Sequence, residues 1–305
     1  MKALLIAEQL RRAVPGGIGT YVRGLLSGLD APVDVALDVT LHASRPPATD
    51  PLTEFGHPVV SSALPAAVLT RLWDRGLVGE PGGYDVVHAT ALAAPARPRA
   101  PRSMLVHDLA WRHHPEAYPA RGRRWHETAL RRALRETDLL MSPSIETAEA
   151  LRAAGADRVE VVEHGADHLP PADHAAASAL LEGLGVASPF LLTVSTLEPR
   201  KNLARILEAY SRARTELPEP WPLLVVGPKG WGEDVQPVPG AHLTGFVSEA
   251  TLAALYATAR CLVYVPLEEG FGLPAVEAMQ AALPVVASPM PSTGGAALEV
   301  DPLDV

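Results

Sequence analysis

A chain of 305 residues is long enough for about two domains, and its 48% hydrophobic and 20% charged residues are typical of a globular protein rather than a disordered one. A net charge of −9 without a recognised nucleic-acid-binding motif argues against nucleic acid as a partner. One cysteine excludes a disulfide framework, and the apolar stretches are too short for a signal peptide or a spanning helix, so we expect a cytoplasmic protein.

The first expected strand is the apolar run Met1–Ala7. It is followed by a glycine-rich loop, Pro15–Tyr21, and an amphipathic helix through Val22, Leu25, Leu26 and Leu29. Gly17 and Gly19 would let the backbone of this loop approach a phosphate or a sugar closely. A nicotinamide-binding protein is a rival interpretation. Its fingerprint needs three glycines directly after the strand, whereas here the glycines come later and the third is missing.

Two further strands are expected to end near histidines, over Tyr84–His88 and Met104–Leu109. A histidine at a strand end is most often a hydrogen-bonded structural residue. His107, which Asp108 follows directly, is the better candidate for chemistry. The histidines lack the spacing of metal ligands, so we expect no metal site.

Charge is concentrated between positions 97 and 135, which carry ten arginines and three acidic residues. Trp111, Tyr118 and Trp125 are interleaved with these arginines. One interpretation is an ordinary solvated arginine-rich helix. The other is contact with an anionic membrane surface or a lipid-linked acceptor, because tryptophan and arginine both favour the membrane interface.

In the second half, apolar runs alternate with helical patterns, which predicts a parallel sheet with ligands at the carboxyl ends of its strands. Arg200 and Lys201 stand between the first of these runs and the next helix. Adjacent cations beside the positive end of a helix dipole suit a diphosphate. The expected strands are Phe190–Ser195, Pro222–Gly227, Leu243–Val247 and Cys261–Pro266.

Glu269 and Glu277 are separated by seven residues that begin with a glycine-rich turn. Gly270 and Gly272 leave the backbone free to approach a ligand, and Pro274 suits the first turn of a helix. The free amides of that helix start favour an anionic or polyhydroxyl ligand. The two carboxylates are suitable acceptors for vicinal hydroxyls, such as those of a ribose or a hexose.

The order of these motifs resembles the family-four retaining glycosyltransferases (glycosyltransferase group 1), and among them bacterial mannosyl- and rhamnosyl-type enzymes. The resemblance covers most of residues 186 to 302. It implies an α/β fold of the GT-B type, with two Rossmann-like domains facing each other across a cleft. The implied domains are an acceptor-side domain over 1–168, a linker over 169–186 and a nucleotide-sugar donor domain over 187–305 that lacks the usual terminal helices.

By this resemblance, Arg200 and Lys201 hold the diphosphate, Glu277 holds the ribose, and Glu269 holds the sugar together with the amides of Phe271 and Gly272. His107 contacts the sugar from the first domain, and the base rests near Phe246 and Val247. The implied catalytic residues are His107, Asp108, Glu269, Arg200 and Lys201. The implied nucleotide-sugar-binding residues are Gly17, Gly19, Arg200, Lys201, Phe246, Val247, Glu269, Gly270, Phe271, Gly272, Leu273 and Glu277.

The resemblance implies a metal-independent hexosyltransferase without a cofactor, active in polysaccharide biosynthesis. It would move a hexose, with GDP-mannose as the first donor to consider, to a hydroxyl of a glycan or lipid-linked acceptor with retention of configuration. The chain departs from the family pattern at Ser195 and Ala282, where relatives usually have glycine, and it stops at Val305. Two alternatives therefore stay open: a truncated, inactive nucleotide-sugar-binding protein and a sugar-nucleotide epimerase on the same fold.

Overall fold

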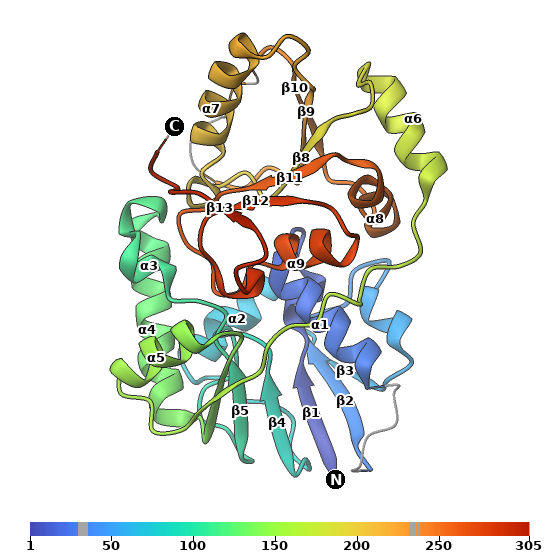
Figure 1. Cartoon of the computed structure of the whole chain (residues 1–305). Helices are drawn as coiled ribbons and strands as arrows, with labels where there is room; N and C mark the ends of the chain where they lie inside the picture. Colours follow the sequence, from blue (N-terminus) through green and yellow to red (C-terminus); the bar gives the residue numbers. More distant parts are fainter. Residues whose placement is uncertain (30–35, 232–235, 237, 305) are drawn as a thin grey trace. The chain divides into compact units, whose positions relative to one another are not determined.

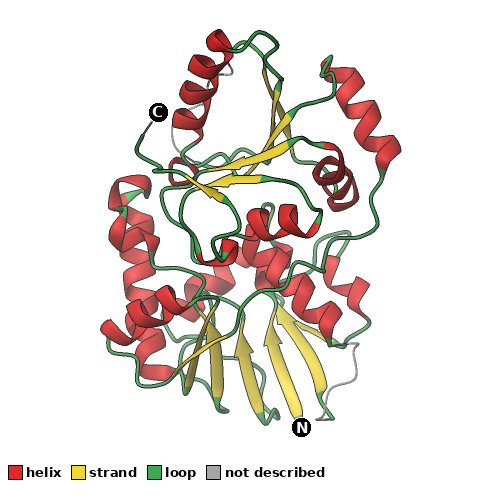
Figure 2. Ribbon diagram, viewed as in Figure 1, coloured by secondary structure: helices red, strands yellow, loops and turns green. Residues whose placement is uncertain are grey.

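The computed structural model describes residues 1–29, 36–231, 236 and 238–304. These residues form two compact units, shown in Figures 1 and 2. The first unit comprises Met1–Leu109 and Pro119–His168, and the second comprises Ala110–Tyr118 and Leu169–Val305. The short segment Ala110–Tyr118 therefore belongs to the second unit, although it interrupts the first in the sequence.

The first unit is built on a seven-stranded sheet with the order β3-β2-β1-β4-β5-β6-β7, and its strand pairs are all parallel. Four of the five residues of the interior strand β1 are buried, as expected for a parallel strand that is covered on both faces. The strands are β1 Lys2–Ile6, β2 Asp38–Ala43, β3 Val59–Ser61, β4 Val86–Ala89, β5 Arg102–Leu105, β6 Leu139–Ser142 and β7 Val159–Val161.

The expected glycine loop before the first helix is a wrong prediction, because α1 already begins at Gly16 and runs over Gly16–Gly28. Gly17 and Gly19 lie in its first turn. A Cβ atom at Gly19 would come within 2.3 Å of the Pro15 Cβ atom, so close packing requires glycine there. The other helices of this unit are α2 Ala66–Asp74, α4 Ala120–Glu136 and α5 Ile145–Ala153.

The arginines between positions 97 and 135 do not form one surface. Arg102 is buried, and its Nη2 atom lies 3.1 Å from Oε2 of Glu80. The Nη1 atom of Arg132 lies 3.2 Å from Oδ1 of Asp74. Asp74 also accepts a hydrogen bond of 2.8 Å from the indole N–H of Trp125. Part of this arginine-rich segment therefore stabilises the fold, since a buried arginine needs a carboxylate partner. The arginines of α4 that remain exposed are Arg121, Arg124, Arg131 and Arg135.

The second unit has a six-stranded sheet with the order β10-β9-β8-β11-β12-β13, again with parallel pairs. The strand order reverses between β8 and β11, and ligands of open α/β sheets bind outside the carboxyl ends of the strands at such a point. The strands are β8 Leu191–Val194, β9 Leu223–Val226, β10 Ala241–Gly245, β11 Cys261–Tyr264, β12 Val285–Ala287 and β13 Leu298–Glu299.

Helices cover both faces of the second sheet (Figure 1). Leu203, Ile206 and Leu207 of α7 pack on one face, while residues of α6, α8 and α9 form a larger core with the other. Helix α6 lies within the segment expected to be a linker, and its Ala177 is part of that core. The helices are α3 Ala110–His113, α6 His174–Leu184, α7 Leu203–Glu216, α8 Glu249–Thr258 and α9 Leu273–Gln280.

Ala282 has a φ of +56°, a conformation in which glycine is the preferred residue. This explains why a glycine would suit the position at which the chain departs from the family pattern. Within the part of the chain that the structure describes, we find no helix of the length and apolarity needed to cross a membrane.

Candidate functional site

The turns that follow β8 and β11 carry the candidate site of the second unit. Arg200 and Lys201 lie in a short 3-10 helix, Pro199–Lys201, in the turn between β8 and α7. Glu268 and Glu269 follow β11, the neighbouring strand in the sheet. Both turns leave the carboxyl ends of their strands at the point where the strand order reverses, so the sequence-predicted cations and carboxylate meet.

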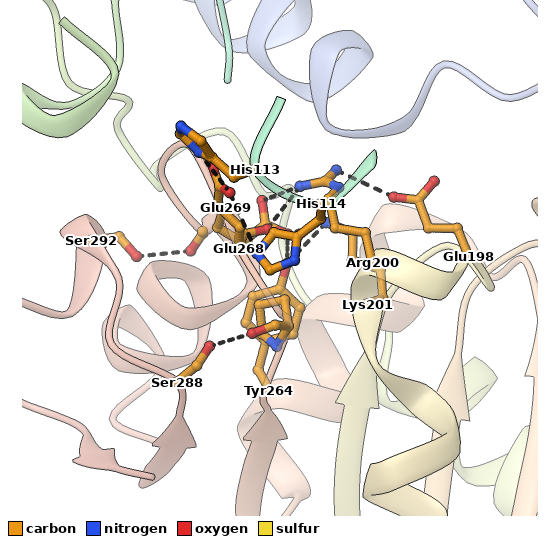
Figure 3. Close-up of polar contacts among 12 residues, drawn as sticks. His113, His114, Glu198, Arg200, Lys201, Tyr264, Glu268, Glu269, Ser288 and Ser292 are labelled. Carbon is orange, nitrogen blue, oxygen red and sulfur yellow. Dashed lines mark hydrogen bonds and ion pairs between the residues drawn. The ribbon is translucent and has the colours of Figure 1, made fainter. Parts of the chain in front are cut away.

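Glu269 is the centre of this cluster (Figure 3). Its Oε1 atom pairs with the Lys201 ammonium and accepts a hydrogen bond of 2.7 Å from the Tyr264 hydroxyl. Its Oε2 atom lies 3.4 Å from Nη1 of Arg200. The Lys201 ammonium also donates to the Tyr264 hydroxyl at 3.2 Å. Two cations and a phenol therefore hold one carboxylate in a fixed position.

The surroundings keep Glu269 ionised. Burial by itself would raise the pKa of this carboxyl group, but the charges of Lys201 and Arg200 outweigh that effect, and hydrogen bonds from Lys201 and Tyr264 add to them. The pKa of Glu269 is lowered from 4.5 to about 2. At neutral pH the group is a hydrogen-bond acceptor and carries no proton that it could donate.

Arg200 also bonds to groups outside the Glu269 carboxylate. Its Nη2 atom donates to Oε1 of Glu198 at 3.2 Å, and its Nη1 atom donates to the backbone carbonyl of Glu268 at 3.0 Å. The guanidinium group thus has a fixed orientation between the two turns. Neither Glu198 nor Tyr264 was predicted from the sequence, although both stand beside motifs that were singled out.

The glycine-rich turn after Glu269 has the close packing that its sequence predicts. Gly272 has a φ of +99°, and a Cβ atom there would lie 2.4 Å from the sulfur of Met290 and 2.8 Å from Oγ of Ser292. The Ser292 hydroxyl donates to the carbonyl of Gly272 at 3.0 Å (Figure 3). Gly270 and Phe271 of this turn are buried, and Leu273 begins α9.

Glu277 lies on α9 and is only 6% exposed. Its Oε2 atom accepts a hydrogen bond of 2.8 Å from the hydroxyl of Tyr256 on α8. Phe246 and Val247, the residues expected to lie near the base, come directly after β10, which ends at Gly245. The Phe246 ring is 77% exposed, whereas Val247 packs against the core.

In the first unit, His107 follows β5 and its Nε2 atom donates to the carbonyl of Thr90 at 2.9 Å. A carbonyl oxygen can only accept, so this bond fixes the tautomer and leaves Nδ1 as the acceptor of the neutral ring. Burial lowers the pKa of His107, despite opposing contributions from the Thr90 carbonyl and from Asp108. Asp108 is the next residue in the same loop.

Further aromatic residues surround His107 that the sequence analysis did not select. The ring of Tyr21 lies 5.4 Å from that of His107 and 4.9 Å from that of His164. The Tyr21 hydroxyl is 3.1 Å from Nε2 of His88, whose Nδ1 atom is 2.9 Å from the Ser103 hydroxyl. Burial lowers the pKa of His88 to about 4 and raises that of Tyr21 to about 12. These side chains are therefore uncharged at neutral pH.

Among the side chains that the structure describes, no group of three or more His, Cys, Asp or Glu residues is placed to hold a metal ion. The polar clusters of the two units consist of hydrogen-bonding and charged groups.

Comparisons with known proteins agree with this geometry. The family model described as Glycosyltransferase Family 4 matches residues 15–168, and the model described as Glycosyl transferases group 1 matches residues 182–297. The O-antigen chain mannosyltransferase B of Escherichia coli is 32% identical over 216 residues, which are 65% of this chain and 57% of that protein. The MMP alpha-(1->4)-mannosyltransferase of Mycolicibacterium hassiacum is 28% identical over 90% of this chain and 77% of its own length.

Solved structures show the same fold. HepE of Anabaena, solved in complex with UDP-glucose, has a TM-score of 0.69 at 20% identity and matches 100% of this chain and 86% of its own. Sucrose-phosphate synthase of Thermosynechococcus elongatus has a TM-score of 0.65 at 18% identity. Each unit has the parallel α/β architecture of the GT-B enzymes. The chain belongs to the group 1 glycosyltransferases of family four, as the family models show across both of its units.

Proposed function

We propose that the chain is a retaining hexosyltransferase that takes a sugar from a nucleoside diphosphate and places it on a hydroxyl of a glycan or lipid-linked acceptor. The observation that carries the proposal is the cluster of Arg200 and Lys201 around Glu269 at the strand-order reversal of the second sheet. The two fixed cations supply positive charge at the position where ligands of such sheets bind, and a diphosphate is an anion that pairs with it.

In the proposed reaction, the departing diphosphate gains negative charge as the bond to the sugar breaks. Arg200 and Lys201 are already held in position, so they stabilise that charge without reorganisation, and the reaction needs neither a bound metal nor another cofactor. Glu269 accepts a hydrogen bond from a hydroxyl of the sugar and so orients the sugar ring. The acceptor attacks the face that the diphosphate leaves, and the departing phosphate takes the acceptor proton.

Mannose is the sugar that the relatives support. Both relatives described above are named as mannosyltransferases, one of them for the O-antigen chain. We therefore propose GDP-mannose as the first donor to test. The chain spans 57% of the length of the O-antigen relative, so the activity is proposed for the residues present here and tested on them.

The test is calorimetric titration of the 305-residue chain with UDP, GDP, ADP and dTDP. Tight binding of one of them supports the proposal and identifies the base. Absence of binding to all four contradicts it. The chain is then incubated with the matching nucleotide sugar without an acceptor, because an epimerase would still convert the sugar under these conditions and a transferase would not.

Glu277→Ala is expected to weaken binding of that nucleoside diphosphate by about 1 to 3 kcal/mol, because a ribose hydroxyl loses its acceptor. Inorganic diphosphate has no ribose, so its affinity should not change. Tyr256→Phe is the matched control for packing, since it removes the hydrogen bond to Glu277 and keeps the carboxylate. Equal losses for the nucleotide and for inorganic diphosphate would assign Glu277 to the structure of the site rather than to the ribose.

We also propose that α4 contacts anionic membrane surfaces through charge alone. Its exposed arginines, Arg121, Arg124, Arg131 and Arg135, follow a spacing of three, seven and four residues and so share one helix face. Trp125 is hydrogen-bonded to Asp74 and Trp111 is buried, which argues against aromatic insertion. Each arginine near an anionic surface contributes about 1 kcal/mol.

The double variant Arg124→Glu and Arg131→Glu should therefore lose most of its co-sedimentation with vesicles that contain phosphatidylserine. Binding of the wild type should also fall as salt is raised, because the attraction is screened. Arg158→Glu with Arg212→Glu makes the same change of charge on exposed residues outside α4. Salt-independent binding, or equal losses in the two double variants, would rule out the α4 face.

A further inference from the structure

A short segment from the first half of the sequence lies against the candidate site of the second unit. Ala110–Tyr118 belongs to the second unit and contains α3 and the turn that follows it. It contacts other parts of this unit at two places that bear on the site. Near its middle, histidines contact Glu268, and near its end the backbone and an aromatic ring contact Trp231.

The first contact is a cluster of two imidazoles and one carboxylate (Figure 3). The Nδ1 atom of His113 lies 3.0 Å from both carboxylate oxygens of Glu268 and donates to them. The Nε2 atom of His114 lies 3.6 Å from Oε2 of the same carboxylate. The side chains of His113, His114 and Glu268 are 56%, 27% and 25% exposed, so a ligand can reach them.

The second contact lies in the turn after β9. The indole N–H of Trp231 donates to the carbonyl of Ala117 at 3.1 Å. The ring of Tyr118 lies 6.1 Å from that of Trp231. Both ends of the stretch from His113 to Tyr118 are therefore fixed to the second unit.

The order of the strands decides what this stretch passes over. Glu268 follows β11 and Trp231 follows β9, and β8 lies between these two strands in the sheet. A segment held by residues that follow β9 and β11 spans the region beyond the carboxyl end of β8, which lies between them. The turn that follows β8 carries Arg200 and Lys201. The stretch from His113 to Tyr118 is thus a strap across the proposed diphosphate site.

We propose that His113, His114 and Glu268 form a second recognition site on this strap, which binds hydroxyls of the transferred sugar. The inference rests on the proposed function. Imidazoles and a carboxylate offer both donors and acceptors, which is what vicinal hydroxyls need. Glu268 is the sequence neighbour of Glu269, and its carbonyl holds Arg200 at 3.0 Å. A sugar attached to a diphosphate at Arg200 would therefore lie next to this cluster.

The test compares two ligands on each variant: the nucleoside diphosphate that the chain binds and the corresponding nucleotide sugar. In His113→Ala with His114→Ala, and separately in Glu268→Gln, the affinity for the nucleotide sugar should fall about tenfold or more, because hydrogen bonds to a charged group are lost. The affinity for the nucleoside diphosphate should stay within about twofold, since it has no sugar to lose. His174→Ala, an exposed histidine at the start of α6, should change neither.

Trp231→Phe is the second variant, because it removes the N–H bond to Ala117 and leaves the imidazole–carboxylate cluster in place. It should show the same selective loss, smaller in size, and it decides the question if the histidine variants fail to fold. Equal losses for both ligands would assign the strap a purely structural role and overturn the inference, as would unchanged affinities. A wild-type chain that binds no nucleotide would contradict the proposed function itself.

Discussion

Replacing Glu269 with glutamine is expected to lower the free energy of unfolding by about 3 kcal/mol at pH 7. Glutamine preserves the shape of the side chain but leaves Lys201 and Arg200 without their shared counter-charge, and breaking a buried ion pair from one side costs roughly 3 to 5 kcal/mol. The side chains of Lys201 and Glu269 are 12% and 11% exposed, so water compensates little of that loss. Urea unfolding of the two proteins measures the difference.

The pH dependence of this difference has a definite sign. The pKa of Glu269 in the folded protein is about 2, below the ordinary value of 4.5, so ionisation favours the folded state. The stabilisation is complete above pH 4.5 and is lost as the pH falls toward 2, and a pKa lowered this far corresponds to roughly 3 kcal/mol. Glutamine does not titrate. The stabilities of wild type and variant should therefore converge as the pH is lowered through this window.

Glu208→Gln is the matched control for that measurement. Glu208 pairs with Arg212 on the exposed side of α7, where both side chains are more than half exposed. Such surface pairs contribute less than about 1 kcal/mol. If Glu269→Gln behaved like Glu208→Gln at every pH, the buried cluster would not exist as described.

The strands that position this cluster were predictable because strands of a parallel sheet are continuous apolar runs. The runs near Phe190 and Cys261 correspond to β8 and β11, and the rule that ligands gather at carboxyl ends predicted that Arg200 and Glu269 would meet. The edge strand β10 is shifted by two residues, since it runs over Ala241–Gly245, and β8, β9 and β11 are each two residues shorter than expected. The local sequence pattern was sufficient to locate these strands, because a strand that is buried on both faces consists almost entirely of apolar residues.

The side chains that contact Glu268 and Glu269 could not be predicted from local sequence patterns. His113 and Glu268 are 155 residues apart in the sequence, and their contact depends on the path of the whole chain. Tyr264 reads as one more apolar residue of a buried strand, yet its hydroxyl bonds to Glu269. A sequence pattern reports which face a residue occupies. It does not report which distant side chain that face meets.

Glycines and arginines illustrate the same limit. Gly272 has the positive φ and close contacts that its motif indicated, whereas Gly19 is helical and is needed for packing against Pro15. Arg102 and Arg124 belong to one arginine-rich stretch, but the first is buried against Glu80 and the second is exposed. Composition cannot separate these roles, because each depends on whether a carboxylate from elsewhere in the chain is near.

The largest expected effect on binding follows from Arg200→Ala. Removing one member of a hydrogen-bonded charge pair from a binding site costs about 2 to 5 kcal/mol, so affinity for the nucleoside diphosphate should fall at least about thirtyfold. Lys201→Met should act similarly, since it also removes one cation. Arg205→Ala is the matched control, because Arg205 lies in the first turn of α7 and bonds to Asn202 instead of Glu269.

The number of phosphates provides the sharper measurement. If Arg200 and Lys201 act on the diphosphate, the loss in either variant should be absent for the free nucleoside, intermediate for the monophosphate and greatest for the diphosphate. A constant loss across the three ligands would mean that the variants had disturbed the site as a whole. Because Arg200 also joins the turns after β8 and β11 through the Glu268 carbonyl, only this dependence on phosphate number separates its charge from its structural role.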